Sequence, residues 1–580
     1  YNVAIGFEAG HDISTGAYNS IIGGLAGDAL TTGNFNIAIG HNALSTEDTG
    51  SRNVAIGKGA LESLNYDGDA YNVAVGYEAG TAISTGVQNT IVGGLAGDAL
   101  TSGGGNVAIG DRALSTEDTG NYSTAVGYRA LKDQNYSGAS YNVAVGTDAG
   151  LSVSTGIQNT IIGALAGDAL TTGGDNVLVG KGAGSDLVGG SGNIAIGLSA
   201  LGSEDANGRN VAIGYQSLIL QNAGTDAYNV AIGYQSGANV STGALNTFVG
   251  GASGDAITTG SNNVAIGYET LSSEDTGSRN VAVGEGSLKS LNFDGNGYNV
   301  AVGYDSGTSV TTGTHNIIIG GLAGDALTDG IENVLIGHAA GGALTSGGSN
   351  VAIGAYALDS EDGHGKNIAI GRAALGVQNA GADAYNVAIG YHAGTAVTTG
   401  TSNTILGGLA GDALTTGSYN IAIGRAALST EDGHGRNVAI GYAALETQDA
   451  GADAYNVAVG FNAGNAVTTG IKNTIIGGLA GESTTTGSNT AVGYAAARLT
   501  TIGNDNVAVG LQALYTNVDG SKSIAIGRNA LYAQDPASEV DMYNVAVGHN
   551  AGLSVTTGTL NTLIGGLAGD ALTSGLANTA

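Results

Sequence analysis

The sequence predicts an all-β fold, a parallel β-roll or β-solenoid in which one short motif builds each coil. Three observations predict it. The pentapeptide Asn2-Val3-Ala4-Ile5-Gly6 recurs in 34 near copies, the usual step between copies is 17 residues, and glycine supplies 105 of the 580 residues. A fixed step over a whole chain is typical of arrays whose units are stable only when stacked. We therefore expect one continuous repeat domain over residues 1–580, with about 17 residues per coil.

Each unit, numbered from its Asn, begins with a predicted strand. Position 3 is usually Ala, position 4 is Ile or Val, and position 5 is Gly in every complete copy. Side chains alternate between the two faces of a strand, so positions 2 and 4 are predicted to share one face and position 3 to occupy the other. A second short strand is expected at positions 8 and 9, as in Ala43-Leu44, followed by a polar turn.

The Asn and Gly positions are predicted to be structural. Stacked asparagines can form a ladder of amide hydrogen bonds from coil to coil. Gly tolerates positive φ and close approach of another backbone, which suits a corner. The first ladder members are Asn2, Asn19, Asn36, Asn53 and Asn72, and the matching corner glycines are Gly6, Gly23, Gly40, Gly57 and Gly76.

Longer steps group the coils into blocks of four or five. Steps of 19 residues, and once of 21, precede coils that begin with Tyr-Asn. In the second coil of each block, position 3 is Ile, Leu or Phe instead of Ala. With position 3 placed on the outer face, these bulky residues are predicted to lie in an interface between chains. The blocks start near residues 1, 71, 141, 228, 298, 385, 455 and 543, and the interface candidates are Ile21, Ile91, Ile161, Phe248 and Ile318.

Acidic residues collect in the loops between blocks. Glu47 and Asp48 lie one coil before Asp67 and Asp69. Ca²⁺ takes six to eight oxygen ligands, so these four carboxylates are candidates for a structural Ca²⁺ site. The alternative is a solvated acidic turn, because the equivalent loop around Tyr136 has no carboxylate.

Composition excludes several classes of function. A net charge of -31, from 48 acidic and 17 basic residues, argues against binding nucleic acid or inserting into an anionic membrane. The chain has no Cys, and its eight His lack the spacing of zinc-binding motifs. The adjacent Glu-Asp pairs point apart, whereas glycoside hydrolysis needs two converging carboxylates. We therefore expect no enzyme activity and no cofactor apart from the possible Ca²⁺.

The repeat Asn-Val-Ala-Ile-Gly-x-x-Ala-Leu, followed by Thr-Gly, resembles the repeats of long virion fibres of tailed phages, which often end in an endosialidase-type chaperone. It is also similar to the head repeats of trimeric autotransporter adhesins, whose period is shorter. The resemblance implies a left-handed β-roll assembled as an extracellular homotrimeric rod. Because the chain begins with Tyr and stops three residues into a further copy, we expect an excerpt of a longer protein.

The function that this resemblance implies is a structural fibre shaft of a phage tail or other virion appendage. Such a shaft holds a receptor-binding tip away from the particle, and contacts with a host-surface receptor belong to parts outside this segment. The alternative is a bacterial surface adhesin or filament that binds through its side surface.

Overall fold

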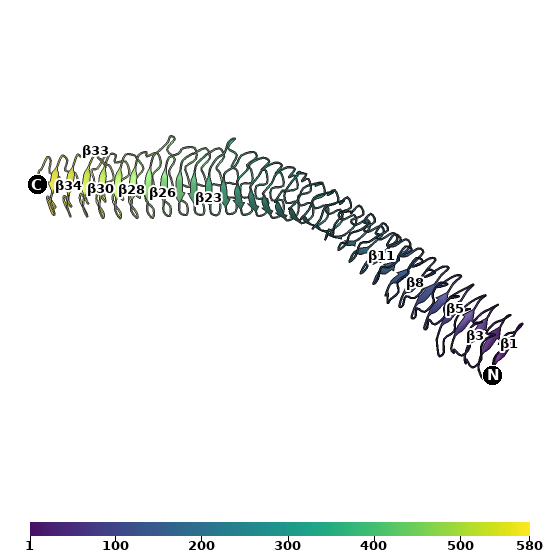
Figure 1. Ribbon diagram of the computed structural model, residues 1–580. Coiled ribbons are helices and arrows are strands. Elements are labelled where there is room, and N and C mark those ends of the chain that lie inside the picture. The colour runs from purple at the N-terminus through teal and green to yellow at the C-terminus, as the bar shows by residue number, and fades with distance from the viewer. The chain divides into compact units, whose positions relative to one another are not determined.

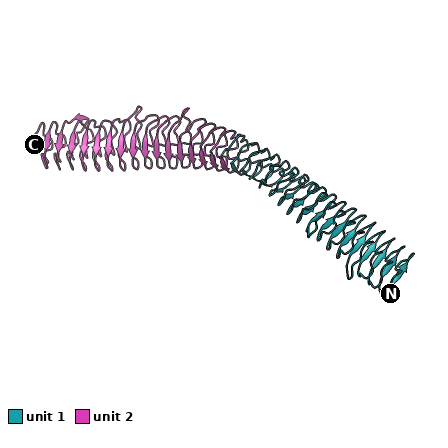
Figure 2. Ribbon diagram, in the orientation of Figure 1, with its two compact units in different colours: residues 1–297 teal, residues 298–580 magenta.

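The computed structural model describes residues 1–580, which form strands and turns and no helix. The chain is a parallel β-solenoid with about 17 residues per coil, which confirms the predicted fold class. It divides into two compact units, Tyr1–Gly297 and Tyr298–Ala580 (Figure 2). The second unit begins at one of the predicted block starts. No helix of the length and apolar character needed to cross a membrane is found.

The first unit stacks one three-residue strand per coil, and each strand pairs in parallel with the strands of the coils before and after it (Figure 1). The register joins equivalent repeat positions, so that Ile21 lies beside Ala4 and Ala38. The strands are β1 (Val3–Ile5), β2 (Ser20–Ile22), β3 (Ile37–Ile39), β4 (Val54–Ile56), β5 (Val73–Val75), β6 (Thr90–Val92), β7 (Val107–Ile109), β8 (Thr124–Val126), β9 (Val143–Val145), β10 (Thr160–Ile162), β11 (Val177–Val179), β12 (Ile194–Ile196), β13 (Val211–Ile213), β14 (Val230–Ile232), β15 (Thr247–Val249), β16 (Val264–Ile266) and β17 (Val281–Val283).

The second unit repeats this arrangement and ends with a bridge from Thr562 to Thr579, where a further coil begins. Its strands are β18 (Val300–Val302), β19 (Ile317–Ile319), β20 (Val334–Ile336), β21 (Val351–Ile353), β22 (Ile368–Ile370), β23 (Val387–Ile389), β24 (Thr404–Leu406), β25 (Ile421–Ile423), β26 (Val438–Ile440), β27 (Val457–Val459), β28 (Thr474–Ile476), β29 (Thr490–Val492), β30 (Val507–Val509), β32 (Ile524–Ile526), β34 (Val545–Val547) and β35 (Thr562–Ile564), with β31 (Gly520–Ser521) and β33 (Val540–Asp541) forming a separate parallel pair in a loop.

The core corrects the predicted orientation of the strand. Position 3 points into the coil, and positions 2 and 4 point outward. The inward residue is Ala wherever the facing turn carries a Leu, and every bulky inward residue faces a Gly in its own coil, although the first coil of a block combines Ala with Gly, as at Ala4 and Gly10. Gly27, in the same coil as Ile21, has space that Ile21 fills: a Cβ added at Gly27 would lie 3.2 Å from Ile21 Cδ1. The predicted interface role is therefore wrong for all five candidates, which are fully buried within the chain: Ile21, Ile91, Ile161, Phe248 and Ile318.

The predicted second strand is also wrong, because positions 8 and 9 lie in a run of turns. Left-handed residues recur in this run, with φ of 58° at Asn42 and 54° at Leu44. The backbone N–H groups in this run reach both neighbouring coils, while that of Ala43 between them donates to Gly40 O in its own coil. The N–H of Asn42 donates to the coil before it, at 3.2 Å from Gly24 O, and that of Leu44 to the coil after it, at 3.0 Å from Ala60 O.

The asparagine ladder runs between side chain and backbone. Asn36 Oδ1 accepts the backbone N–H of Asn53 at 2.9 Å, and Asn36 Nδ2 donates to Gly50 O in its own coil at 2.8 Å. The same Oδ1 contact joins Asn2 to Asn19, Asn19 to Asn36 and, at 3.2 Å, Asn53 to Asn72. Each of these Oδ1 atoms therefore holds the next coil. The Nδ2 of Asn2, Asn19 and Asn36 also closes its own coil, whereas that of Asn53 donates to Asn36 Oδ1 and Ser51 O.

The corner glycines allow the coils to stack this closely. Gly6, Gly23, Gly40, Gly57 and Gly76 have φ between 135° and 147°. A Cβ added at Gly23 would overlap the backbone of Gly40 in the next coil. A side chain at this position is excluded both by the φ value and by the neighbouring backbone.

Candidate functional site

The outer strand face is a regular surface that runs along each unit. Positions 2 and 4 carry Val, Ile and Thr along each unit and are half exposed, as at Ile162 (40%) and Ile319 (36%). The residues before the Asn and after the Gly are often aromatic and are more exposed, as at Tyr18 (52%) and Tyr77 (51%). Two apolar columns therefore face outward, and on either side of them runs a column in which aromatic residues are interspersed with polar residues and glycine. Contiguous apolar surface of this kind is typical of protein interaction sites.

The aromatic column before the Asn is stacked from coil to coil. The rings of Tyr1 and Tyr18 lie 5.2 Å apart, and those of Tyr18 and Phe35 lie 5.0 Å apart. Arg52 continues the column, with its guanidinium 5.5 Å from the ring centres of both Phe35 and Tyr71. A guanidinium between two rings gains cation–π attraction while it stays in contact with water.

The start of most blocks is held by an ion pair that sequence reasoning missed. A basic residue before the Asn of one coil meets an Asp in the longer loop that follows. Arg52 Nε lies 3.0 Å from Asp69 Oδ2, and Lys366 Nζ lies 2.5 Å from Asp383 Oδ2. The available signal was the Asp three residues before the Asn of a Tyr-Asn coil, paired with Arg or Lys one coil earlier. Equivalent pairs are Arg209–Asp226, Arg436–Asp453 and Lys522–Asp541.

The four Ca²⁺ candidates do not come together in one ligand set. Glu47 is fully buried, and its Oε1 and Oε2 accept the backbone N–H groups of Gly50 (2.6 Å) and Tyr66 (3.2 Å). Asp67 and Asp69 are exposed and take separate partners: Thr49 Oγ1 donates to Asp67 at 2.8 Å, and Asp69 pairs with Arg52. Asp48 contributes its backbone oxygen, which accepts the N–H of Thr31 at 2.6 Å.

Glu47 is buried and holds its loop closed through hydrogen bonds to the backbone. Burial raises the pKa of Glu47, and the N–H groups of Gly50 and Tyr66 oppose part of that rise by hydrogen bonding to the charged form. Glu117 is placed in the same way, with Gly120 N at 2.8 Å and Gln134 Nε2 at 2.9 Å. In these loops the Glu carboxylate accepts the N–H of the Gly three residues later, as a backbone carbonyl does in an ordinary turn.

Two loops of the second unit bring acidic and imidazole groups together. Their sequences are Glu361-Asp362-Gly363-His364 and Glu431-Asp432-Gly433-His434. In each loop His Nδ1 lies 3.5 Å from Glu Oε1. Asp449 joins the second cluster from the following coil, and all ligand atoms within each cluster lie within 4.8 Å of one another. Sequence reasoning set these His aside because their spacing matches no zinc motif.

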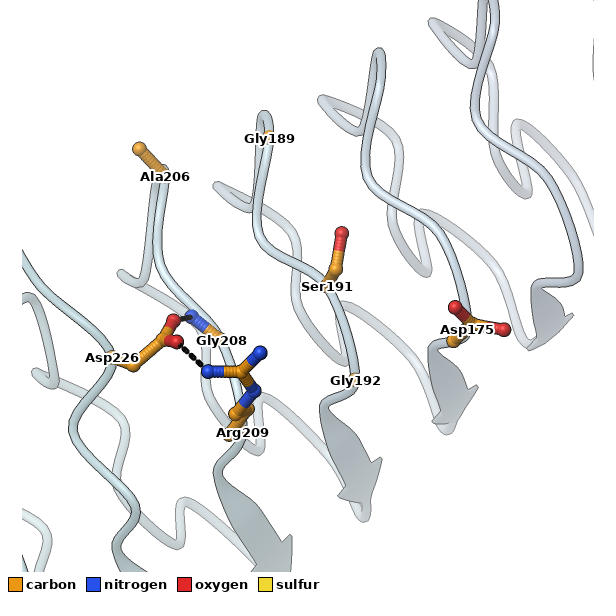
Figure 3. Close-up of a pocket in the computed structure, with 8 residues that line it drawn as sticks. All are labelled: Asp175, Gly189, Ser191, Gly192, Ala206, Gly208, Arg209 and Asp226. Atoms are coloured by element: carbon orange, nitrogen blue, oxygen red, sulfur yellow. Dashed lines mark hydrogen bonds and ion pairs between the residues drawn. The ribbon is translucent and has the colours of Figure 1, made fainter.

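A shallow pocket of about 290 Å³ opens between successive loops of the first unit (Figure 3). Its charged lining is largely satisfied internally: Asp226 pairs with Arg209 and accepts the N–H of Gly208 at 3.2 Å. Arg209 also donates to Tyr228 OH at 2.7 Å. Asp175 stands apart from this pair across Ser191 and Gly192 in the close-up. The pocket offers a small ligand few free polar groups.

In comparisons with known proteins, no family model and no curated protein matches this chain.

Proposed function

We propose that this chain is a structural segment of an extracellular fibre shaft, in which copies of the chain associate through their outer strand faces. The observation that carries the proposal is the half-exposed apolar face formed by positions 2 and 4. At Ile162 and Ile319, β-branched side chains remain about two-fifths exposed although the coil around them is complete. Covering such a surface stabilises an assembly by about 25 cal/mol for each Å² removed from water.

A second copy of the same chain is the partner that this face fits. Side chains on the face recur at the strand spacing of ~4.8 Å, so a partner must present apolar groups with the same spacing. An identical solenoid does so along its whole length. Association of equal chains is also the common form of protein assembly. The resemblance of the repeat to phage fibres and trimeric adhesin heads supports an assembly of three chains and a location on a virion.

The solenoid architecture supports a mechanical role in preference to a chemical one. Most coils are closed by a hydrogen bond from their own Asn, as at Asn36, and contact their neighbours through a parallel ladder. Such repeats extend a structure by addition of coils. A shaft that separates a receptor-binding tip from a particle needs this property.

A bacterial surface adhesin is the second candidate, and the exposed aromatic columns favour it. Stacked rings such as Tyr215 and Tyr234, 5.2 Å apart, form a ridge beside the apolar columns. A filament that binds through its side could use this ridge. In a self-associating shaft, the ridge instead lies at the margin of the interface between copies.

Electron microscopy and sedimentation of purified residues 1–580 test the proposal together. The shaft predicts unbranched rods with the mass of several chains. Single chains that bind saturably to cells or glycans, and lose that binding when Tyr215 and Tyr234 become Ala, would favour the adhesin instead.

A further inference from the structure

The two Glu-Asp-Gly-His loops differ from the loop of Glu117 in what their buried carboxylates contact. The loop of Glu204, which has no His, also leaves one carboxylate oxygen without a partner. In the loop of Glu117, both carboxylate oxygens accept hydrogen bonds from protein groups. In the His loops this closure is incomplete. Glu361 is fully buried, and neither of its carboxylate oxygens has a hydrogen-bond partner. Glu431 is fully buried as well, and its Oε2 has none.

The imidazole groups beside these carboxylates are also incomplete. The Nδ1 atoms of His364 and His434 are shielded from water and have no hydrogen-bond partner. Each Nδ1 lies 3.5 Å from the Oε1 of the Glu three residues before it in the same loop. An unpaired buried carboxylate is costly, so a cation between these atoms would remove a strain that the protein alone leaves in place.

We propose that the loops of Glu361 and Glu431 each bind one divalent transition-metal ion of the Zn²⁺ class. His Nδ1 and the buried Glu form the inner side of each site, and the Asp that follows the Glu forms the outer side. Asp449 supplies a further carboxylate to the second site. These residues are the only ones in the chain where three or more such ligand atoms gather within 4.8 Å.

The geometry and ligand types favour this class of metal. Two ligands at about 2.0–2.2 Å from one tetrahedral ion lie roughly 3.3–3.6 Å apart, which the separation of Nδ1 and Oε1 matches. An imidazole nitrogen suits Zn²⁺ and its neighbours, whereas Ca²⁺ prefers a shell of oxygens alone. The outer carboxylates Asp432 and Asp449 are exposed, so an ion can enter from solvent without opening the coil.

The two proposed sites differ in their fourth ligand, Asp449, which only the second site has, so each serves as a comparison for the other. Asn379 occupies the position in the first site that Asp449 occupies in the second, 18 residues after the Glu. Both side chains are exposed. Exchanging them therefore changes the ligand set of each site with little expected effect on folding. The buried Gln378 is not a ligand, because its Oε1 already accepts Asn386 Nδ2 at 2.7 Å.

Titration calorimetry of the full chain with zinc chloride tests the proposal. We expect two saturable sites per chain, the tighter at Glu431. Asp449→Asn should weaken the tighter site by at least about tenfold, and Asn379→Asp should strengthen the other by a similar factor. His434→Gln and His364→Gln should each remove one equivalent. The control His549→Gln, at an exposed His outside both clusters, should retain two.

Absence of saturable zinc binding would overturn the proposal, since the loops would then hold water only. Binding whose stoichiometry is the same in His364→Gln, His434→Gln and the parent chain would overturn it as well. If a His variant fails to fold by circular dichroism, the Asp449→Asn and Asn379→Asp pair decides, because unchanged affinity in both would contradict the ligand assignment.

Discussion

Asn159 Oδ1 lies 3.1 Å from the backbone nitrogen of Asn176, one coil further along, and accepts its N–H. Asn159 Nδ2 donates to Gly173 O in its own coil at 3.0 Å. One buried amide therefore satisfies two backbone groups that water cannot reach. This relationship recurs along both units and explains why the Asn is kept at almost every coil.

Asn159→Ala should leave the N–H of Asn176 and the carbonyl of Gly173 without partners. The expected cost is about 2–6 kcal/mol, because each of the two unsatisfied buried groups costs about 1–3 kcal/mol. Solenoids can open locally, so the measurement is amide hydrogen exchange in the coils on either side of Asn159. The exposed Asn222→Ala is the control. Equal protection in both variants would show that the ladder contributes little.

Gly163→Ala should destabilise its coil strongly. Gly163 has a φ of 137°, and an added Cβ would overlap Gly180 O. Strain of this backbone type costs about 1–3 kcal/mol before the overlap is counted. Gly566→Ala is the matched control, because a Cβ there meets nothing within 4 Å and the φ is not left-handed. Soluble yield and thermal unfolding should fall for the first variant and not for the second; similar behaviour would contradict the corner role.

Ile161 and Ile162 are adjacent residues with opposite surroundings, fully buried and 40% exposed respectively. Ile161→Asp should unfold its coil at a cost of at least about 3 kcal/mol, because it places an unpaired charge in the core. Ile162→Asp should leave the coil folded and dissociate the assembly. Circular dichroism and sedimentation separate the two effects. The proposed interface is wrong if Ile162→Asp retains the parent's mass.

The same pair of residues shows what the sequence could and could not predict. Alternation predicted two strand faces, but alternation alone does not say which face is enclosed. The size match between Ile161 and the glycines around it carried that information: a Cβ added at Gly150 would lie 2.9 Å from Ile161 Cδ1. The repeat period and the all-β fold class could be predicted without knowing which strand face is enclosed.

The candidate metal sites were harder to predict. His434 and Glu431 are three residues apart in a turn, and their convergence depends on the turn backbone and not on a strand or helix period. The ion pair between Arg209 and Asp226 joins residues one coil apart, so it required the stacking register. Both features follow from the coil geometry once it is known.

The buried Glu274 should make the protein more stable as the pH falls toward 4.5. Burial raises the pKa of Glu274 above its ordinary 4.5, against hydrogen bonds from the N–H groups of Gly277 and Phe293. The unfolded chain keeps the ordinary pKa, so between the two values the folded state binds more protons. The free energy of unfolding therefore decreases as the pH rises through that window.

Urea unfolding at several pH values measures this effect. Glu274→Gln should flatten the profile, because the amide cannot ionise while its oxygen can still accept the N–H of Gly277, 2.7 Å from Oε1 in the parent. The exposed Glu539→Gln serves as the control and should keep the parent slope. A Glu274→Gln profile as steep as that of the parent would contradict the burial argument.

Self-association through the outer strand face is the central claim, and the mass of purified residues 1–580 tests it most directly. Sedimentation equilibrium or native mass spectrometry should give three times the 56.4 kDa of one chain. A stable monomer of 56.4 kDa at micromolar concentration would contradict the claim, and would mean that the Val and Ile columns face solvent or a different partner.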